Sequence, residues 1–473
     1  MASANNRIIV FGTLLVILGF TSSAFGAGLF LTPRGVRPLS RGGAFVAGAD
    51  DLNALSYNPA GIALSQNEIL LDFGFPIHFT EFTRSDTDGD GKPEPTVEGT
   101  GLGIPSPTIG IVGDFNLVQG LRFASGVAAD YPLLQNWPDS LPDGSPAPQR
   151  YAIQNYNGTT ISKFYVGAAY AFDGWLAVGM TAQALVGNFV ATMTASNCSG
   201  GPLCVQPENP DFDAAIQMAS DFLVIPGIQV GVTIVPVEWL KLGVAWESGY
   251  TVNADADIRV RLPSAAIFDD AVLNPKDPRG VIRMEFPWIL RAGIEGNWDK
   301  WLKSEVAFVY EAWSVHDKID VDVTGVSVEN VSGIDDYSLA SVPIERHLKD
   351  TWSIRWGTEF TPMIGEERDL TLRFGLAYEP SAVPNQYLTP MAVDLDKTII
   401  GLGGEYQFEK FAIEATYALV LMPNTEVTDG LVRQTNATRP PFEERTAIGN
   451  GSYTSNAHVV GVGVHFEYDA FFR

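Results

Sequence analysis

The sequence is poor in positive charge and in cysteine, and long apolar runs are missing beyond its first segment. Only 18% of its 473 residues are charged, and 30 Lys and Arg stand against 55 Asp and Glu, which leaves a net charge of −25. Because no block of five or more basic residues offsets this repulsion, nucleic acid is not an expected partner. No run of about 18 apolar residues follows the first segment, which excludes a bundle of transmembrane helices.

The motifs of common enzymes are missing as well. There is no His-Glu-x-x-His motif, Gly91-Lys92 leads into Pro93 instead of completing a phosphate-binding loop, and the five histidines are scattered. We therefore expect neither catalytic activity nor a cofactor, with calcium as the one ion for which the sequence offers a loop.

The first segment predicts export. Arg7 precedes an apolar run over residues 8–20, and the small residues Ala24 and Gly26 favour cleavage after Gly26. We predict a signal peptide over residues 1–26. A membrane anchor is the alternative, but the run is shorter than the ~20 residues that span a bilayer.

The two cysteines lie close together in the sequence. Cys198 and Cys204 flank a Gly- and Pro-containing loop, and an oxidising compartment favours a disulfide between them. Two free thiols are the alternative.

Glycine, aromatic residues and strict alternation are what the sequence does contain. It has 47 glycines, 11% aromatic residues and a mean hydropathy of +0.07, which suits a membrane β-barrel. From Trp352 to Phe360 apolar side chains occupy every second position, and the same period recurs over 240–247, 370–379, 411–421 and 460–468. Each of these segments predicts an amphipathic strand.

The two faces of these strands favour a membrane barrel over a soluble sandwich. The apolar face carries Trp and Tyr near the strand ends, whereas the other face is rich in Gly, Ala and Glu instead of the Lys, Thr and Ser of a water-facing surface. Lipid outside and a crowded polar lumen inside account for both faces. A soluble all-β protein is the alternative.

We therefore predict an all-β fold, a transmembrane antiparallel up-and-down β-barrel over residues 67–473, in the bacterial outer membrane. Short links are expected to be periplasmic turns, at 172–174, 236–238, 297–300, 364–367 and 409–410. Long links are expected to be extracellular loops, at 132–158, 263–278, 324–346, 381–395 and 424–453. About 14 strands are predicted, at 67–82, 100–118, 120–131, 159–173, 174–194, 213–236, 237–262, 279–297, 300–323, 347–362, 367–380, 396–408, 410–423 and 454–469.

Residues 27–66 do not alternate and are predicted to fill the lumen as a plug. Arg34, Arg37 and Arg41 lie in this segment of an otherwise acidic chain. We expect them to anchor the plug by charge-assisted hydrogen bonds to inward glutamates. The predicted inward glutamates are Glu247, Glu359, Glu379, Glu405 and Glu414. A flexible periplasmic tail is the alternative.

The plug segment resembles the FadL/OmpP1/TodX family of outer-membrane transport proteins. The resemblance rests on the start Ala27-Gly28-Leu29-Phe30, on Gly42-Gly43-Ala44 and Ala49-Asp50-Asp51, and above all on Asn58, Pro59, Ala60 and Gly61. It implies passive uptake of hydrophobic compounds, most of all long-chain fatty acids, or else aromatic hydrocarbons. The implied partners are these small molecules, outer-membrane lipid and the barrel-assembly machinery.

The resemblance also implies lateral exit through a kinked third strand. That strand ends in Tyr131-Pro132 here, and proline removes a donor from the strand ladder. We predict the opening at Gly126, Asp130, Tyr131 and Pro132. The alternative is that Pro132 simply ends the strand.

The loop after this strand is apolar although it is expected to face outward. Exposed apolar residues often bind ligands, so Leu133, Leu134 and Trp137 are the predicted capture groove. Ordinary packing of the loop is the alternative.

Inside the barrel, three arginines have inward parity. Arg291, Arg355 and Arg373 are candidates for binding a ligand carboxylate, since a guanidinium matches its two oxygens. The alternative is that they pair with inward glutamates, namely Glu295, Glu359 and Glu379. The histidine with inward parity, His465, is expected to fill the lumen rather than to act beside a serine.

One acidic loop has the spacing of a calcium site. Asp86, Asp88 and Asp90 alternate before Gly91, but the closing glutamate expected at position 97 is a valine. A plain acidic turn is the alternative. Two other functions also remain open, a structural or adhesive barrel that uses such acidic loops and a diffusion porin, against which the plug argues.

Overall fold

The computed structural model describes most of the chain beyond residue 33. The described residues are 34–87, 90–102, 105–115, 117–129, 136–156, 158–198, 204, 208–299, 301–323, 325–339, 341–364, 369–434 and 447–467. The predicted signal peptide lies outside these ranges, as do Asp88, Asp130, Tyr131, Pro132, Leu133 and Leu134. No helix within the described residues is both long enough and apolar enough to cross a membrane.

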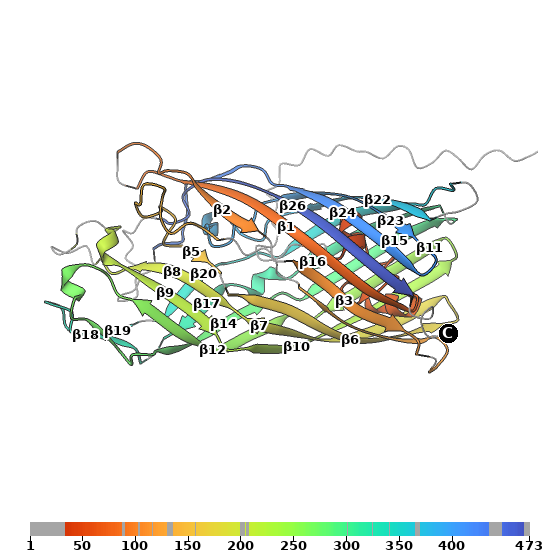
Figure 1. Cartoon of the computed structure of the whole chain (residues 1–473), viewed down its shortest axis with the longest axis horizontal. Helices are drawn as coiled ribbons and strands as arrows, with labels where there is room; N and C mark the ends of the chain where they lie inside the picture. Colours follow the sequence, from red (N-terminus) through yellow and green to blue (C-terminus); the bar gives the residue numbers. More distant parts are fainter. Residues whose placement is uncertain are drawn as a thin grey trace, which may run out of the picture.

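The described residues form a closed ring of fourteen antiparallel strands, which confirms the predicted barrel and its strand number (Figure 1). The last strand pairs with the first from Glu68 opposite Glu467 to Arg84 opposite Gly451. In ring order the strands are β1 (Glu68–Arg84), β3 (Ser106–Gly113), β4 (Leu121–Ala128), β6 (Thr160–Phe172), β7 (Leu176–Asn188), β10 (Leu223–Val237), β11 (Leu240–Glu247), β15 (Ile289–Trp298), β16 (Leu302–Glu311), β21 (Thr351–Phe360), β22 (Leu370–Glu379), β23 (Lys397–Gln407), β24 (Phe411–Leu421) and β26 (Gly451–Glu467).

A second, seven-stranded sheet continues the barrel at the end that carries the long loops (Figure 1). Its order is β20 (Val342–Glu345), β17 (Lys318–Asp322), β14 (Arg279–Phe286), β12 (Tyr250–Arg261), β9 (Asp213–Ser220), β8 (Val190–Ser196) and β5 (Ile153–Asn155). The expected single strands over 174–194, 213–236, 237–262, 279–297 and 300–323 are therefore wrong. Each is broken where the chain passes from one sheet to the other; at Pro287, for example, the backbone has no N–H to continue the ladder.

The remaining elements are short. β2 (Val97–Leu102) and β25 (Thr425–Val427) extend the edges of β1 and β26, while β13 (Val272–Asn274), β18 (Ser327–Glu329) and β19 (Tyr337–Ser338) form a small sheet in the long loops. The helical turns are α1 (Val36–Ser40), α2 (Ala54–Tyr57), η1 (Pro59–Leu64), η2 (Pro210–Phe212), η3 (Ala266–Phe268), η4 (Trp313–Val315) and η5 (Asn385–Tyr387).

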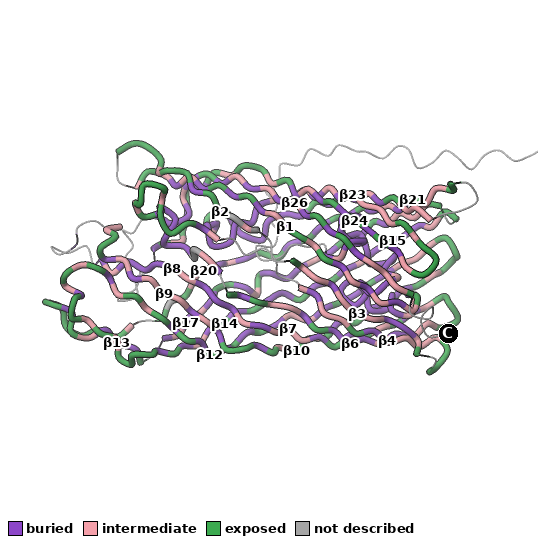
Figure 2. The backbone as a smooth tube through the Cα atoms, in the orientation of Figure 1, coloured by how far each residue is buried: buried purple, intermediate pink, exposed green. Residues whose placement is uncertain are grey.

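The outer surface changes character between the two sheets. Buried and more exposed residues alternate along the barrel strands (Figure 2). The exposed residues include large apolar side chains such as Trp356 and Tyr417. Strand β12 instead exposes Thr251, Asn253 and Asp255, which suit water. The apolar exterior therefore ends near the junction of the two sheets.

Aromatic residues flank the apolar band on both sides. Trp288 and Trp298 stand ten residues apart at the two ends of β15 and are 37% and 47% exposed. With a rise of ~3.4 Å per residue and a tilt of ~40°, they lie about 25 Å apart along the barrel axis, which is the height of the apolar band of outer-membrane barrels.

The plug segment, residues 34–66, lies inside the ring near the short-turn end (red to orange in Figure 1) and is almost wholly buried. Its backbone lies directly against inward glycines of the wall. A Cβ added at Gly375 would come within 2.0 Å of the backbone of Arg41, and one at Gly179 within 2.2 Å of the Pro59 carbonyl oxygen. The small inward residues seen in the sequence are thus the surface on which the plug rests.

Candidate functional site

The Asn-Pro-Ala-Gly motif joins two parts of the plug to the wall. The Asn58 amide donates to the carbonyl of Val46 at 2.8 Å and to the hydroxyl of Thr233 on β10 at 3.0 Å. Its side-chain oxygen accepts from the N–H of Ala60 and so caps η1, with Pro59 at the first helical position. Gly61 cannot be replaced, because an added Cβ would lie 1.7 Å from the Ala49 carbonyl oxygen.

Two of the three plug arginines bind inward glutamates. Arg37 makes a two-pronged contact with Glu359 at 2.7 and 3.2 Å and also bonds Asp50 and Asp51. Arg41 reaches three carboxylates, those of Glu295 at 2.8 Å, Glu305 at 3.1 Å and Glu359 at 3.3 Å. Both guanidinium groups lie about 5 Å from the ring centre of Phe45. The backbone N–H and carbonyl of the third arginine, Arg34, both form hydrogen bonds with the Tyr57 hydroxyl.

The carboxylate of Glu305 also holds plug backbone. It accepts N–H groups from Val46, Ala47 and Gly48 at 2.6, 2.9 and 3.0 Å. A plug segment without regular structure is therefore fixed by a wall residue, and its ejection would leave buried charges without partners.

The three inward arginines of the wall are already neutralised. Arg291 pairs with Glu247 at 2.9 Å, Arg355 with Glu379 at 3.0 Å, and Arg373 with Glu414 at 2.6 Å as well as with Glu405. The three arginines therefore pair with inward glutamates, which was the alternative to binding a ligand carboxylate. The partner of Arg291 is Glu247 and not Glu295. None of the three is a spare cation for a ligand.

The barrel wall has an interruption in its second strand. β1 pairs with β2 from Ile77 onward and with β3 up to Gly74, and the register shifts by one residue between them. The expected unbroken strand over 100–118 is therefore wrong, because Pro105, which lies between β2 and β3, carries no N–H for the ladder. The third strand, β4, then ends at Ala128, so β6 extends past it to Thr160.

The predicted opening residue Gly126 lies within regular pairing, opposite Gly110 on one side and Tyr165 on the other. Next to the interruption the structure has a small pocket between α1 and the wall, with a volume of about 30 Å³, which is room for one or two water molecules. It is lined by Arg34, Gly35, Val36, Leu39, Gly74, Pro76, Ser106, Thr416, Val459 and Gly461.

At the long-loop end a large apolar cluster, here called the upper cluster, fills the space enclosed by the second sheet and the loops. Trp137 belongs to it and is 4% exposed, with its indole N–H donating to the Pro390 carbonyl at 2.8 Å. The expectation that Trp137 lies on an exposed groove is therefore wrong, since its indole is packed inside the upper cluster. Other members include Tyr156, Met193, Met218, Met284, Phe286, Trp313, Leu348, Val383, Leu388 and Met391.

One buried charge lies beside the upper cluster. Arg346 is 1% exposed, and its three guanidinium nitrogens have no hydrogen-bond partner among the residues that the structure describes. Its charge acts on Tyr156 and Asp394, but Asp394 is already held by Lys397 and the N–H of Ala382. Burial lowers the pKa of Arg346 below its usual value.

His316 lies close to this arginine. Its Nδ1 bonds the Glu285 carbonyl at 2.6 Å, while its fully buried Nε2 has no partner among the described residues. Burial first, and then the charge of Arg346, lower the pKa of His316 to about 4. Because a carbonyl only accepts, Nδ1 carries the proton of the neutral ring and Nε2 presents a lone pair.

The two loop predictions have different outcomes. Cys198 and Cys204 form the predicted disulfide. In the acidic loop, Asp86 and Asp90 accept the N–H groups of Gly91 and Lys92, so these carboxylates shape the turn, and the calcium site stays a prediction.

A closed barrel with an apolar belt, two aromatic borders and a filled lumen defines an integral protein of the bacterial outer membrane. Residues 17–468 match the family described as "Outer membrane protein transport protein (OMPP1/FadL/TodX)", and the chain belongs to that family. No curated protein sequence gives a significant match.

Solved structures of the same fold cover nearly the whole chain. A FadL homologue of Pseudomonas aeruginosa is 14% identical with a TM-score of 0.72, and the match covers 93% of this chain and 100% of that one. The toluene transporter TodX of Pseudomonas putida is 14% identical with a TM-score of 0.61, over 94% and 100%. The toluene transporter TbuX of Ralstonia pickettii is 14% identical with a TM-score of 0.57, over 92% and 99%.

Sequence reasoning missed Arg346 and His316. Both lie in segments between strands, where no alternation shows which side chains turn inward. The available signal was weak: Arg346 is the last residue of the predicted extracellular loop 324–346, and His347 and Leu348 are predicted to begin the next strand.

Proposed function

We propose that this protein takes up long-chain fatty acids passively across the outer membrane, with capture beside the upper cluster and lateral exit through the wall. The observation that carries the proposal is the buried, unpartnered guanidinium of Arg346 beside a large apolar cluster. A buried unpaired charge costs several kcal/mol, roughly, so a ligand that supplies the missing anion is strongly favoured.

A fatty acid satisfies both parts of this site. Its alkyl chain gains about 0.8 kcal/mol per buried methylene, and its carboxylate can form two parallel hydrogen bonds with a guanidinium. An aromatic hydrocarbon is the second candidate, because two similar structures are toluene transporters. Such a molecule has no group to offer Arg346.

The proposed exit lies where α1 leaves space against the wall. The pocket reaches from Arg34 in the plug to Pro76 and Ser106, which border the interruption between β2 and β3. The ion pairs of Arg37 and Arg41 hold the remainder of the plug, so the proposed route passes beside the plug and does not require its ejection. Leaving the wall sideways returns the chain of the ligand to hydrocarbon.

The test is uptake by cells that lack the gene and carry plasmid copies of it. We expect Arg346→Gln to lower the apparent affinity for labelled oleate about 10- to 100-fold, since a hydrogen bond to a charged group contributes about 1.5–3 kcal/mol. Labelled toluene measures uptake that does not depend on a carboxylate. Arg279→Gln is the matched control, because Arg279 is exposed and paired with Asp221 and Asp257.

Two results would contradict the proposal. Equal uptake of oleate with and without the gene would favour an adhesive or structural barrel. An Arg346→Gln protein with normal oleate uptake would remove the assigned role of the guanidinium and favour an aromatic hydrocarbon.

A further inference from the structure

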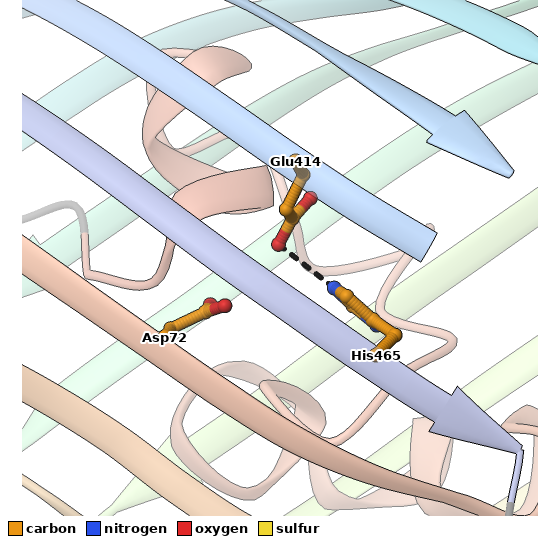
Figure 3. Close-up of side chains that lie close together, drawn as sticks. All are labelled: Asp72, Glu414 and His465. Atoms are coloured by element: carbon orange, nitrogen blue, oxygen red, sulfur yellow. Dashed lines mark hydrogen bonds and ion pairs between the residues drawn. The ribbon is translucent and has the colours of Figure 1, made fainter. Parts of the chain in front are cut away.

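Three side chains from three neighbouring strands meet below the plug, at the seam where the barrel closes. Asp72 on β1, Glu414 on β24 and His465 on β26 each offer one metal-ligand atom, and these atoms lie within 4.8 Å of one another (Figure 3). The register explains the meeting, because Asp72 and Glu414 are both direct partners of Gly463 on β26. An added Cβ at Gly463 would lie 2.1 Å from Asp72 Oδ1, so the glycine leaves the space open.

A second observation singles out the Asp72 carboxylate. The residue is 1% exposed, and within the described part of the chain its Oδ1 has no hydrogen-bond partner. Figure 3 shows this carboxylate directed toward Glu414 and His465. A buried carboxylate oxygen without a donor is costly, and a cation placed between the three residues would satisfy it.

Each of the three groups is also held in place from behind. Asp72 Oδ2 accepts the N–H of Val36 at the start of α1, at 2.9 Å. His465 Nδ1 lies 3.3 Å from Glu68 Oε2, and Glu414 Oε2 accepts from Arg373 at 2.6 Å. A carboxylate behind the imidazole and fixed hydrogen bonds behind each oxygen are the outer-shell arrangement that metal sites use.

We propose that Asp72, Glu414 and His465 bind one Zn²⁺ ion. One imidazole nitrogen and two carboxylate oxygens suit zinc, whereas Mg²⁺ and Ca²⁺ prefer oxygen alone. An ion at the centre of three such atoms is at most about 2.8 Å from each, so sub-ångström movements bring them to the 2.0–2.2 Å of zinc bonds. The His465 Nε2 that now faces Glu414 at 2.8 Å would become the nitrogen ligand.

The ion would link β1, β24 and β26 across the seam at which the barrel closes. Through the bond from Val36 to Asp72 it would also fix the start of α1, which lines the pocket beside the wall. Zinc binding should therefore stabilise the closed barrel, since a ligand that binds only the folded state raises its stability. This inference does not depend on which compound is transported.

The experiment uses the full-length mature protein in detergent, without an affinity tag, after removal of metals by a chelator. We expect one Zn²⁺ per chain by calorimetry and elemental analysis, and a rise of a few degrees in the melting temperature on its addition. Co²⁺ bound in place of Zn²⁺ should give the strong visible absorption bands of a four-coordinate site. This measurement uses the unmodified protein and needs no variant. The spectrum of hydrated Co²⁺ alone would overturn the proposal.

The variants Asp72→Asn and His465→Gln should lose the zinc stoichiometry and the rise in melting temperature. Glu405→Gln is the matched control, because Glu405 is the cross-strand partner of Glu414 and bonds the same Arg373 but is not a ligand. Circular dichroism verifies the barrel in each case. Zinc retained by both ligand variants, or lost equally from the control, would contradict the assignment.

Discussion

The lumen around the plug and the upper cluster give a buried arginine opposite surroundings. Arg41 and Arg346 are both almost fully buried, at 0% and 1% exposure. Arg41 is surrounded by three carboxylates, whereas no described residue forms a hydrogen bond with the guanidinium of Arg346. A charge that the protein has neutralised is structural, and one that it leaves unpaired is available to a ligand. The comparison therefore separates the part that holds the plug from the part proposed to bind.

The largest effect is expected from Arg41→Met. The change leaves Glu295 and Glu305 buried without their cation, which should lower the free energy of unfolding by about 3–5 kcal/mol. Thermal unfolding in detergent, followed by circular dichroism and by mobility on gels, measures it. A loss below about 1 kcal/mol would mean that the ion pairs of the plug are weaker than their burial indicates.

Low pH should reduce the stability of the folded protein by protonating His316 beside the upper cluster. Its pKa of about 4 in the folded protein lies below the usual 6.5, so its contribution to stability is complete above pH 6.5 and is lost as the pH falls toward 4. The loss is at most about 3 kcal/mol. Unfolding curves of the native protein and of His316→Gln at several pH values isolate it, and parallel pH profiles for the two would contradict the prediction.

Arg346→Met should change the free energy of unfolding in the opposite direction from Arg41→Met. Removing a buried unpaired charge is expected to raise the free energy of unfolding by about 1–3 kcal/mol, while oleate affinity falls. The same unfolding assay, beside Arg41→Met, gives a direct comparison of one substitution in two places. If both variants lose stability equally, the distinction between the two regions is wrong.

A smaller loss is expected from Asn58→Ala. The variant removes the bonds to Val46 and Thr233, and the cost should be about 1–2 kcal/mol. Thr233→Val is the control for the wall side of this contact. A change within the error of the unfolding assay would show that the motif is held by packing alone.

The sequence predicted the barrel well because alternation is a local property. Phe411 to Leu421 shows its two faces without reference to any other strand, and β24 has these bounds. The charged character of the plug was equally visible, and Arg37 and Arg41 bind inward glutamates as expected.

The breaks between the two sheets and the identity of the free cation could not be predicted. A strand such as 237–262 keeps its alternation through Ser248 and Gly249, so nothing local reveals that β12 joins another sheet. Whether an arginine is paired depends on residues far away in the chain. Arg355 and Arg346 are nine residues apart, yet only the first has a carboxylate partner.

The fit of the plug onto wall glycines sets the order of assembly. The plug is synthesised first, but Arg37 needs Glu359, which follows 322 positions later, and Val36 approaches Gly461 in the last strand. The earliest part of the chain is thus among the last to settle. Until the ring closes, its arginines remain accessible to a trypsin-like protease, so the moment at which residues 34–66 become resistant to cleavage would time the closure of the barrel.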